Sequence, residues 1–402
     1  LLVIGAHPDD EDTSMLTLVS RGLGGEAAYL SLSRGEGGQN LIGIELGEGL
    51  GVLRTQELLA ARRIDGAHQF FTRAFDFGYT RSLDETLRRW PREVLLEDVA
   101  RVVWRFRPQV IVAMFSREIG GHGQHLASGW AAEEVFPLAG SAHAFPRLVA
   151  EGWLPWQPAS LYRRAWFDPE NASFEVSLGR VEALSGRSML QIAMASRSQH
   201  RSQDMGMLQP LGSRAAGLAM VARSGGPDDV PSESVDAGGL FDGVDTRLEA
   251  IASTVSDEEA RREVSDALRE AARLAGAARV GLSPARLADA VQPLATVLDG
   301  LHRAHAAVAG SPEPGARIAA ELVWEKIEIA RAGLAAAAGV GIEAVSDREA
   351  VAPGEAAAIV ASVWNSGGEA VEALAVELSG SQDWRVESRE IDPASASVWE
   401  LD

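Results

Sequence analysis

Short apolar runs alternate with amphipathic stretches over residues 1–210. In the amphipathic stretches, such as 49–63 and 84–106, apolar residues recur every three or four positions, which predicts helices. The apolar runs have the length of strands and lie at residues 1–6, 27–32, 68–72, 109–114 and 161–167. Strands that alternate with helices predict an α/β domain with a Rossmann-like, mostly parallel sheet and helices on both faces.

The pattern changes after residue 210. Residues 211–244 are rich in Gly, Ser, Pro and Asp, which predicts a linker or long loop. Residues 245–339 are rich in Ala and have a helical period, so we expect a helical domain there. Over 340–402, apolar runs flank the turn "NSGGE" (365–369), which predicts paired strands of a small β-sandwich-like domain. This last segment is short for a complete sandwich, so we expect it to be incomplete.

Composition narrows the class of protein. The net charge of −20 disfavours nucleic acid and anionic membranes as partners. No apolar run reaches the length of a membrane span. The chain has no cysteine, which excludes disulfides, thiolate metal sites and a cysteine nucleophile. Because the chain opens inside a predicted strand without an initiator Met, we expect a processed segment that has lost any targeting peptide.

Three polar segments follow predicted strands. "HPDDED" (7–12) follows the first strand, "SRGEGGQN" (33–40) the second, and "FSREIGGHGQH" (115–125) the fourth. Ligands of such sheets bind beyond the carboxyl ends of the strands, so we expect the three segments to meet at one rim. The four consecutive acids of the first segment repel one another unless a metal, a salt bridge or water offsets their charge.

These residue types suit a catalytic metal site. His7 and Asp10 are three residues apart at a strand end and could bind one metal, with Asp9 or Glu11 as a base. "GGHGQH" offers two candidates for a further ligand, His122 and His125.

Simpler readings remain open for each motif. The acids could cap a helix at a strand–helix turn, and the histidines could lie in a surface loop by chance. "GEGGQN" could be an ordinary turn, and Arg54 with Glu57 an ion pair on a helix surface. His302 and His305 fit a solvated helix face better than a metal site.

In combination, "AHPDDE", "SRGEGGQN" and "GGHGQH" resemble the PIG-L/LmbE-like zinc N-deacetylases over residues 1–210. The resemblance implies that zinc is bound by His7, Asp10 and His125. It implies that Asp9 is the general base for the attacking water. It also implies that His122 stabilises the oxyanion and helps to protonate the leaving amine. The residues that match substrate-binding positions are Glu36, Arg54, Asp76 and His200.

One position departs from the family pattern. Many relatives carry His-x-Asp-His, whereas Gln124 precedes His125 here, so a carboxylate that would orient a histidine is absent. We expect Glu11 to orient the loop rather than to contact substrate. Asp12 is expected to be solvated or to cap the next helix.

The resemblance implies a zinc-dependent hydrolase that removes an N-acyl group, in the first place acetyl, from an amino sugar such as N-acetylglucosamine or from a glycoconjugate. Another divalent metal such as Fe²⁺ could replace Zn²⁺. The alternatives are a deacylase or amidase of a non-sugar metabolite, and a degenerate carbohydrate-binding protein. The expected partner is a small-molecule or glycan substrate.

The regions after residue 244 carry no chemical motif. We expect them to cover the catalytic domain, to form a homo-oligomer or to position the enzyme on an extended substrate. Appended β-sandwiches are familiar in secreted glycan-active proteins, which favours a secreted or periplasmic location.

Overall fold

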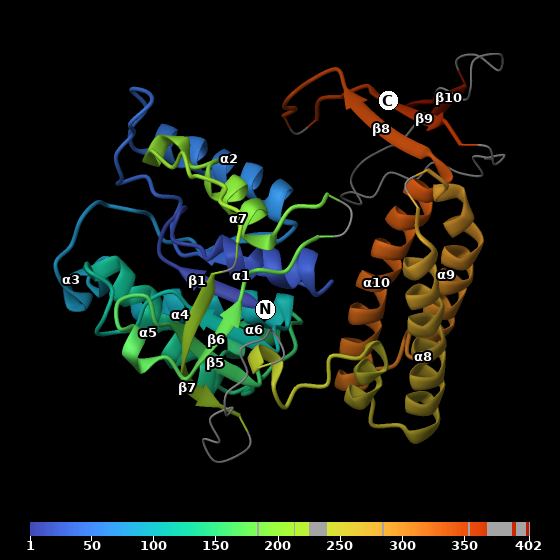
Figure 1. Ribbon diagram of the computed structural model, residues 1–402, viewed down its shortest axis with the longest axis horizontal. Helices are drawn as coiled ribbons and strands as arrows, with labels where there is room; N and C mark the ends of the chain where they lie inside the picture. Colours follow the sequence, from blue (N-terminus) through green and yellow to red (C-terminus); the bar gives the residue numbers. More distant parts are fainter. Residues whose placement is uncertain are drawn as a thin grey trace. The chain divides into compact units, whose positions relative to one another are not determined.

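The computed structural model describes residues 1–182, 185–212, 214–224, 239–283, 285–352, 354–367, 388–390 and 399–401. The chain forms two compact units, Leu1–Asp245 and Thr246–Asp402 (Figure 1).

The first unit is built on a seven-stranded sheet with the strand order β3-β2-β1-β4-β5-β7-β6. Strands β1 to β5 pair in parallel, and β7 pairs antiparallel with both β5 and β6. The predicted Rossmann-like, mostly parallel sheet is therefore confirmed. The strands span Leu2–Gly5 (β1), Ala28–Ser31 (β2), His68–Phe71 (β3), Val110–Ala113 (β4), Ser160–Arg164 (β5), Phe174–Ser177 (β6) and Ala215–Arg223 (β7).

Two of these strands differ from the sequence prediction. β6 was not predicted, and β7 lies inside the stretch 211–244 that was predicted as a linker. The α/β unit therefore continues to Asp245, past the predicted boundary at residue 210. β7 is built largely from Ala and Gly, whose small side chains give a weak apolar pattern, and its pairing with β5 and β6 supplies the missing stability.

Helices cover both faces of this sheet. Successive side chains of β1 point to opposite faces, so they belong to different apolar clusters. Leu2 and Ile4 belong to one apolar cluster, together with residues of α4 and α5. Val3 belongs to the other, together with residues of α1, α2 and α7. The helices span Thr13–Thr17 (α1, continued by a π turn over Leu18–Gly22), Glu48–Asp65 (α2), Leu83–Leu87 (α3), Arg92–Phe106 (α4), Gly123–Leu138 (α5), Pro146–Ala150 (α6) and Met189–Arg197 (α7), with 3-10 turns at Pro169–Asn171, Arg201–Gln203 and Gly239–Phe241.

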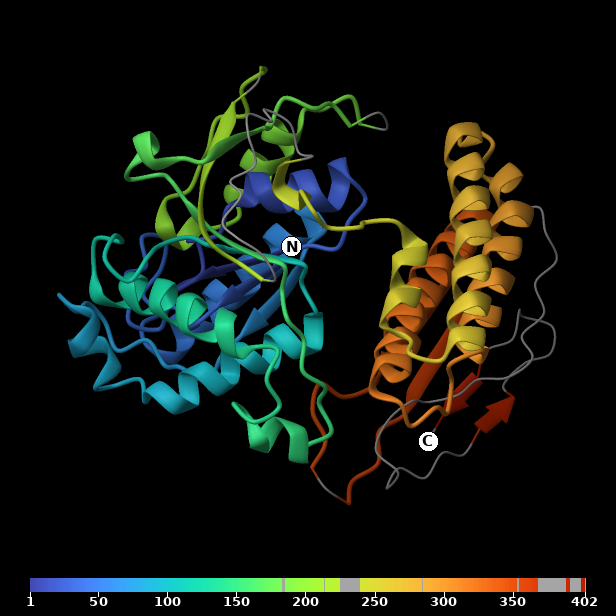
Figure 2. The same cartoon turned by 90° about the horizontal axis from the view of Figure 1, so that it is seen from below.

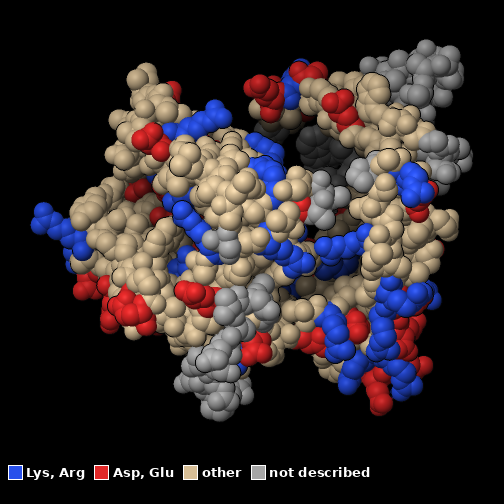
Figure 3. Space-filling view, in the orientation of Figure 1, with Lys and Arg blue, Asp and Glu red and all other residues tan. Residues whose placement is uncertain are grey.

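The second unit begins with three long helices that lie side by side in both ribbon views (Figures 1 and 2). Their apolar core includes Leu268, Leu301 and Val323. Acidic and basic side chains are interspersed on the face shown in Figure 3. Ion pairs such as Arg273–Glu270 lie along the surface of α8. The helices span Glu258–Gly281 (α8), Val291–Ala306 (α9) and Pro314–Ala338 (α10), with 3-10 segments at Leu248–Thr254 and Leu287–Ala290.

Gly339 ends α10 in the left-handed conformation (φ 70°), and an antiparallel sheet follows. The sheet has the order β10-β11-β9-β8. The predicted helical and β regions are thus both present. However, β9 pairs with β8 and β11, and the strand predicted after "NSGGE" lies outside the described residues. The strands span Val340–Ser346 (β8), Ile359–Asn365 (β9), Ser388–Glu390 (β10) and Trp399–Leu401 (β11).

In the described part of the chain, no helix combines the length and apolar character that a membrane span requires.

A buried charge network ties the loop after β1 to α2 and to the chain after α7. The Arg62 guanidinium lies 2.6 Å from Asp65 Oδ2 and 3.3 Å from Glu11 Oε1. His200 Nε2 lies 2.6 Å from the same Glu11 oxygen, and the Ser196 hydroxyl lies within hydrogen-bonding distance of Asp65 (2.6 Å). All five side chains are buried, so each charge depends on its partners rather than on water.

The network predicts a large stability loss for Arg62→Ala. The change leaves Glu11 and Asp65 buried without their shared guanidinium, which costs about 3–5 kcal/mol. Urea titration followed by hydrogen exchange of β1 and α2 peptides would measure it. Arg63→Ala, at the exposed neighbouring position, is the matched control and should change stability by less than about 0.5 kcal/mol. Equal losses in the two variants would contradict this account.

Candidate active site

The predicted convergence of polar segments is present at the carboxyl ends of β1, β2 and β4. The Ser33 hydroxyl, which follows β2, donates to the carbonyl of Ala6, which follows β1 (3.0 Å). The rings of His7 and His125 lie 5.5 Å apart, centre to centre, although 118 positions separate them along the chain. Parallel pairing of the strands puts these segments at one edge of the sheet.

Three histidines form the centre of the site. Each of His7, His122 and His125 offers one ring nitrogen, and these nitrogens all lie within 4.8 Å of one another. Among the residues that the structure describes, no other group of three His, Asp or Glu residues has such geometry. The ring of His125 stacks on Phe115 at 3.8 Å, which holds it in place.

Asp10 contacts two of the three histidines. Its Oδ1 lies 3.1 Å from His125 Nε2, and its Oδ2 lies 3.4 Å from His7 Nδ1. Oδ2 also accepts the backbone N–H groups of Ala6 and His7 (2.9 and 2.8 Å). Burial alone would raise the pKa of Asp10, but the adjacent His125 and His7 hold it well below its usual range.

This donor set fits a divalent metal. His125 Nδ1 lies 2.6 Å from the carbonyl oxygen of Gly120, which can only accept, so Nδ1 carries the proton and Nε2 carries a lone pair. That lone pair faces a carboxylate oxygen of Asp10 at 3.1 Å. Two electron-rich atoms so close require a proton or a cation between them. A carbonyl behind the distal ring nitrogen is also the usual support of a metal-binding histidine.

Asp9 lies next to this cluster with different partners. Its backbone has φ 96°, and its N–H donates to Glu11 Oε2 (2.9 Å). Its carboxylate accepts from Arg54 Nη2 (2.9 Å). Burial raises the pKa of Asp9 to about 6, although the positive charge of Arg54 opposes that shift. The prediction that Glu11 orients the loop agrees with its bond to the backbone of Asp9.

His122 occupies the N-cap position of α5 without a side-chain capping bond, and the centre of its ring lies 3.7 Å from that of His125. Burial, reinforced by the two neighbouring histidines, lowers the pKa of His122 to about 4, so the imidazole is neutral at physiological pH. Its Nδ1 is buried without a hydrogen-bond partner in the structure. The sequence predicts a catalytic role for His122. In the structure its ring nitrogen is also close enough to those of His7 and His125 for all three to bind one metal ion.

The four residues predicted to bind substrate lie in different surroundings. Glu36 accepts the backbone N–H of Asp76 (3.2 Å) and lines a cavity of about 420 Å³ together with Arg34 and Phe75. Arg54 is only 3% exposed; it donates to Asp9 and to the carbonyls of Pro8 and Gly35.

The other two are also buried. Asp76 is 3% exposed and accepts from Gln124 and from the backbone of Gly78, while His200 is fully buried against Glu11. Arg54, Asp76 and His200 thus contact Asp9, Gln124 and Glu11, which lie in or next to the site, and their role in substrate binding stays a prediction.

The structure also gives partners to Asp12 and Gln124. Asp12 caps α1, which is one of its two predicted roles, and it is buried and paired with Arg164 (2.6 Å). Gln124 does contact a histidine, but this is His7, whose Nε2 lies 3.1 Å from Gln124 Oε1.

Three aromatic residues near the site were not predicted. Phe115 stacks on His125, the Tyr29 hydroxyl donates to the carbonyl of His7 (2.6 Å), and the exposed Tyr79 ring lies 5.8 Å from that of His122. Only Phe115 had a signal, since it directly follows a predicted strand.

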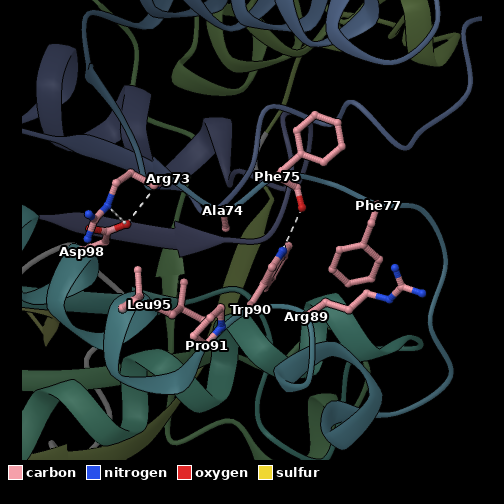
Figure 4. A pocket seen from close by; sticks show the side chains of 10 residues that line it. Arg73, Ala74, Phe75, Phe77, Arg89, Trp90, Pro91, Leu95 and Asp98 are labelled. Carbon is pink, nitrogen blue, oxygen red and sulfur yellow. Dashed lines mark hydrogen bonds and ion pairs between the residues drawn. The ribbon is translucent and has the colours of Figure 1, made fainter.

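A second cavity, of about 470 Å³, borders the segment that carries Asp76 (Figure 4). Phe75, Phe77 and Trp90 contribute aromatic rings to it, and the Arg73–Asp98 ion pair lines one side. Trp90 Nε1 donates to the carbonyl of Phe75 (2.8 Å). The neighbours of Asp76 thus line an apolar cavity, while Asp76 itself contacts Gln124.

Comparison with solved structures finds deacetylases. The N,N′-diacetylchitobiose deacetylase from Pyrococcus horikoshii, in complex with its inhibitor MPG, is 15% identical, with a TM-score of 0.43 over 55% of this chain and 82% of that one. The A40926 pseudoaglycone deacetylase Dbv21 is 13% identical (TM-score 0.36; 56% and 98% covered). The zinc-inhibited form of teicoplanin deacetylase Orf2 is 12% identical (TM-score 0.33; 55% and 99% covered). Likenesses this distant say nothing about the activity of this chain.

No curated protein matches the chain. Residues 2–136 do match a family model, that of PIG-L, described as GlcNAc-PI de-N-acetylase. The match contains the three motifs on which the resemblance was based and ends before His200. The match confirms the resemblance of residues 2–136 to the PIG-L family.

Proposed function

We propose that the first unit is a metal-dependent hydrolase that removes an N-acetyl group from an amino sugar or glycoconjugate. The observation that carries the proposal is the cluster of His7, His122 and His125, two of which contact the carboxylate of Asp10. The family match over residues 2–136 supports it, because that family is described by a de-N-acetylation.

His7, His125 and Asp10 would hold the metal, and His122 is near enough to assist. Two imidazoles and a carboxylate suit Zn²⁺ first, and they also accept Fe²⁺. The bound metal would supply a Lewis acid for the amide carbonyl and would lower the pKa of a water ligand. The low pKa of Asp10 keeps it ionised as a ligand.

Asp9 is suited to be the general base. Arg54 and the backbone bond to Glu11 hold its carboxylate at the edge of the cluster. In the proposed reaction Asp9 takes a proton from the attacking water while the oxygen of that water bonds to the amide carbon. The carbon–nitrogen bond then breaks, the amine departs with the proton that Asp9 took up, and the acetic acid that remains ionises to acetate.

His122 is suited to stabilise the negative charge that develops on the carbonyl oxygen. Its imidazole is neutral, so one ring nitrogen carries a proton that can be donated. As the residue that precedes the first turn of α5, it also lies where the helix dipole favours negative charge.

The proposal predicts acetate release from a panel of N-acetylated sugars and glycosides by the metal-loaded protein. Asp9→Asn should lower the rate by about 10²–10⁴-fold, since it removes the base, and should leave metal content unchanged. Asn tolerates the positive φ of this position, so the backbone should persist. Acetate assays and metal analysis by mass spectrometry would test both points.

Asp10→Asn is the comparison variant and should lose tightly bound metal as well as activity. If Asp9→Asn kept near-parental turnover, Asp9 would not be the base. Release from non-sugar amides alone would show that the sugar substrate is wrong while the hydrolase chemistry holds.

The donor set also predicts the effect of metal removal. Dialysis against a chelator should abolish acetate release, and one equivalent of Zn²⁺ per chain should restore it. Because the chain has no cysteine, a thiolate site cannot account for tight zinc binding. Titration of Zn²⁺ with parallel rate measurements would check this, and full activity in metal-free protein would refute the metal-dependent chemistry.

A further inference from the structure

We propose that Gln124 and Asp76 are positioning residues that set which nitrogen of His7 carries the proton, so that Nδ1 faces the metal. The inference rests on the proposed function only in assuming that a metal binds at the histidine cluster. It assigns a role to the position where this chain departs from the His-x-Asp-His pattern.

The three side chains form a continuous chain of contacts. Asp76 Oδ1 accepts from Gln124 Nε2 at 2.7 Å, and Gln124 Oε1 lies 3.1 Å from His7 Nε2. On the opposite edge of the same ring, His7 Nδ1 lies 3.4 Å from Asp10 Oδ2.

Hydrogen-bonding chemistry gives this chain a direction. An ionised carboxylate can only accept, so Asp76 requires the NH₂ end of the Gln124 amide to face it. The amide oxygen must then face His7, and because that oxygen also only accepts, His7 Nε2 must carry the proton. In the neutral imidazole, His7 Nδ1 is left with the lone pair, on the side of Asp10 and the other histidines.

Burial makes this arrangement hard to replace. Gln124 is 2% exposed and Asp76 is 3% exposed, so water has little access to substitute for either partner. Asp76 is itself held in place, since its Oδ1 also accepts the backbone N–H of Gly78 (2.9 Å). Gly37 packs so closely here that an added Cβ would overlap the backbone nitrogen of Gly78.

A carboxylate in place of Gln124 would lie beside Asp76 and repel it. An amide can instead join an acceptor and a donor, because its NH₂ group donates to Asp76 and its oxygen accepts from His7. The glutamine is thus matched to the buried Asp76, and together they do for His7 what the carbonyl of Gly120 does for His125.

The test measures zinc affinity by competition with a chromophoric chelator. It also measures which nitrogen of His7 is protonated, by long-range ¹H–¹⁵N NMR of metal-free, histidine-labelled protein at a pH high enough for His7 to be neutral. His7 signals are assigned by their loss in His7→Gln. Gln124→Leu removes both contacts. Asp76→Asn lets the Gln124 amide turn round, since an Asn side chain can donate as well as accept. Both should weaken zinc binding by about 10–100-fold and let His7 Nδ1 take up the proton.

Two further variants separate positioning from mere packing. Asp98→Asn removes another buried carboxylate, which holds Arg73 at the start of the same segment, and should change zinc affinity less than twofold. Gln124→Glu keeps an oxygen for His7 to donate to, so it should keep the proton on Nε2. Circular dichroism establishes that each variant is folded.

A parent protein with the His7 proton on Nδ1, or a folded Gln124→Leu variant that binds zinc as tightly as the parent, would overturn the inference. Equal weakening in Asp98→Asn and Asp76→Asn would also overturn it, because movement of the segment would then explain the loss. These readouts need no substrate. If the expected affinities and proton position were found without acetate release, the inference would stand while the proposed function failed.

Discussion

The acids that follow β1 set the main physical problem of this structure, because four carboxylates lie within four residues beside a buried strand. Each is balanced by a different group. Asp9 is paired with Arg54, Asp12 with Arg164, and Glu11 with Arg62 and His200. Asp10 faces two histidines and two backbone N–H groups. Without these partners the loop could not be buried.

The partners come from distant parts of the first unit, so the loop joins them. Arg54 and Arg62 are on α2, Arg164 ends β5, and His200 follows α7. Asp10 is the exception, because its neighbours are imidazoles. Each imidazole can offer a lone pair to a metal when its proton is on the ring nitrogen that points away from Asp10. The clustering that costs energy elsewhere in the loop thus leaves one carboxylate suited to a metal. Asp9 lies beside it, where the proposed function needs a base.

The histidines are also held by groups on the side of each ring that faces away from Asp10. The carbonyl of Gly120 faces the distal nitrogen of His125, and the amide of Gln124 faces that of His7. Both supports are buried, and each leaves the opposite nitrogen directed toward Asp10. A small number of fixed dipoles can therefore prepare a metal site before any metal is bound.

The sequence by itself predicted the first five strands, a mostly parallel sheet and the meeting of the segments that carry His7 and His125, because the carboxyl ends of parallel strands lie at one edge of a sheet. The choice of His125 over His122 as a metal ligand came from the family resemblance. It could not reveal β7, whose small residues become a strand only between β5 and β6. Nor could it show which residues Asp76 and His200 contact, or that Gln124 serves His7. Those contacts join residues 48 to 189 positions apart, and only tertiary packing decides which side of a segment is buried.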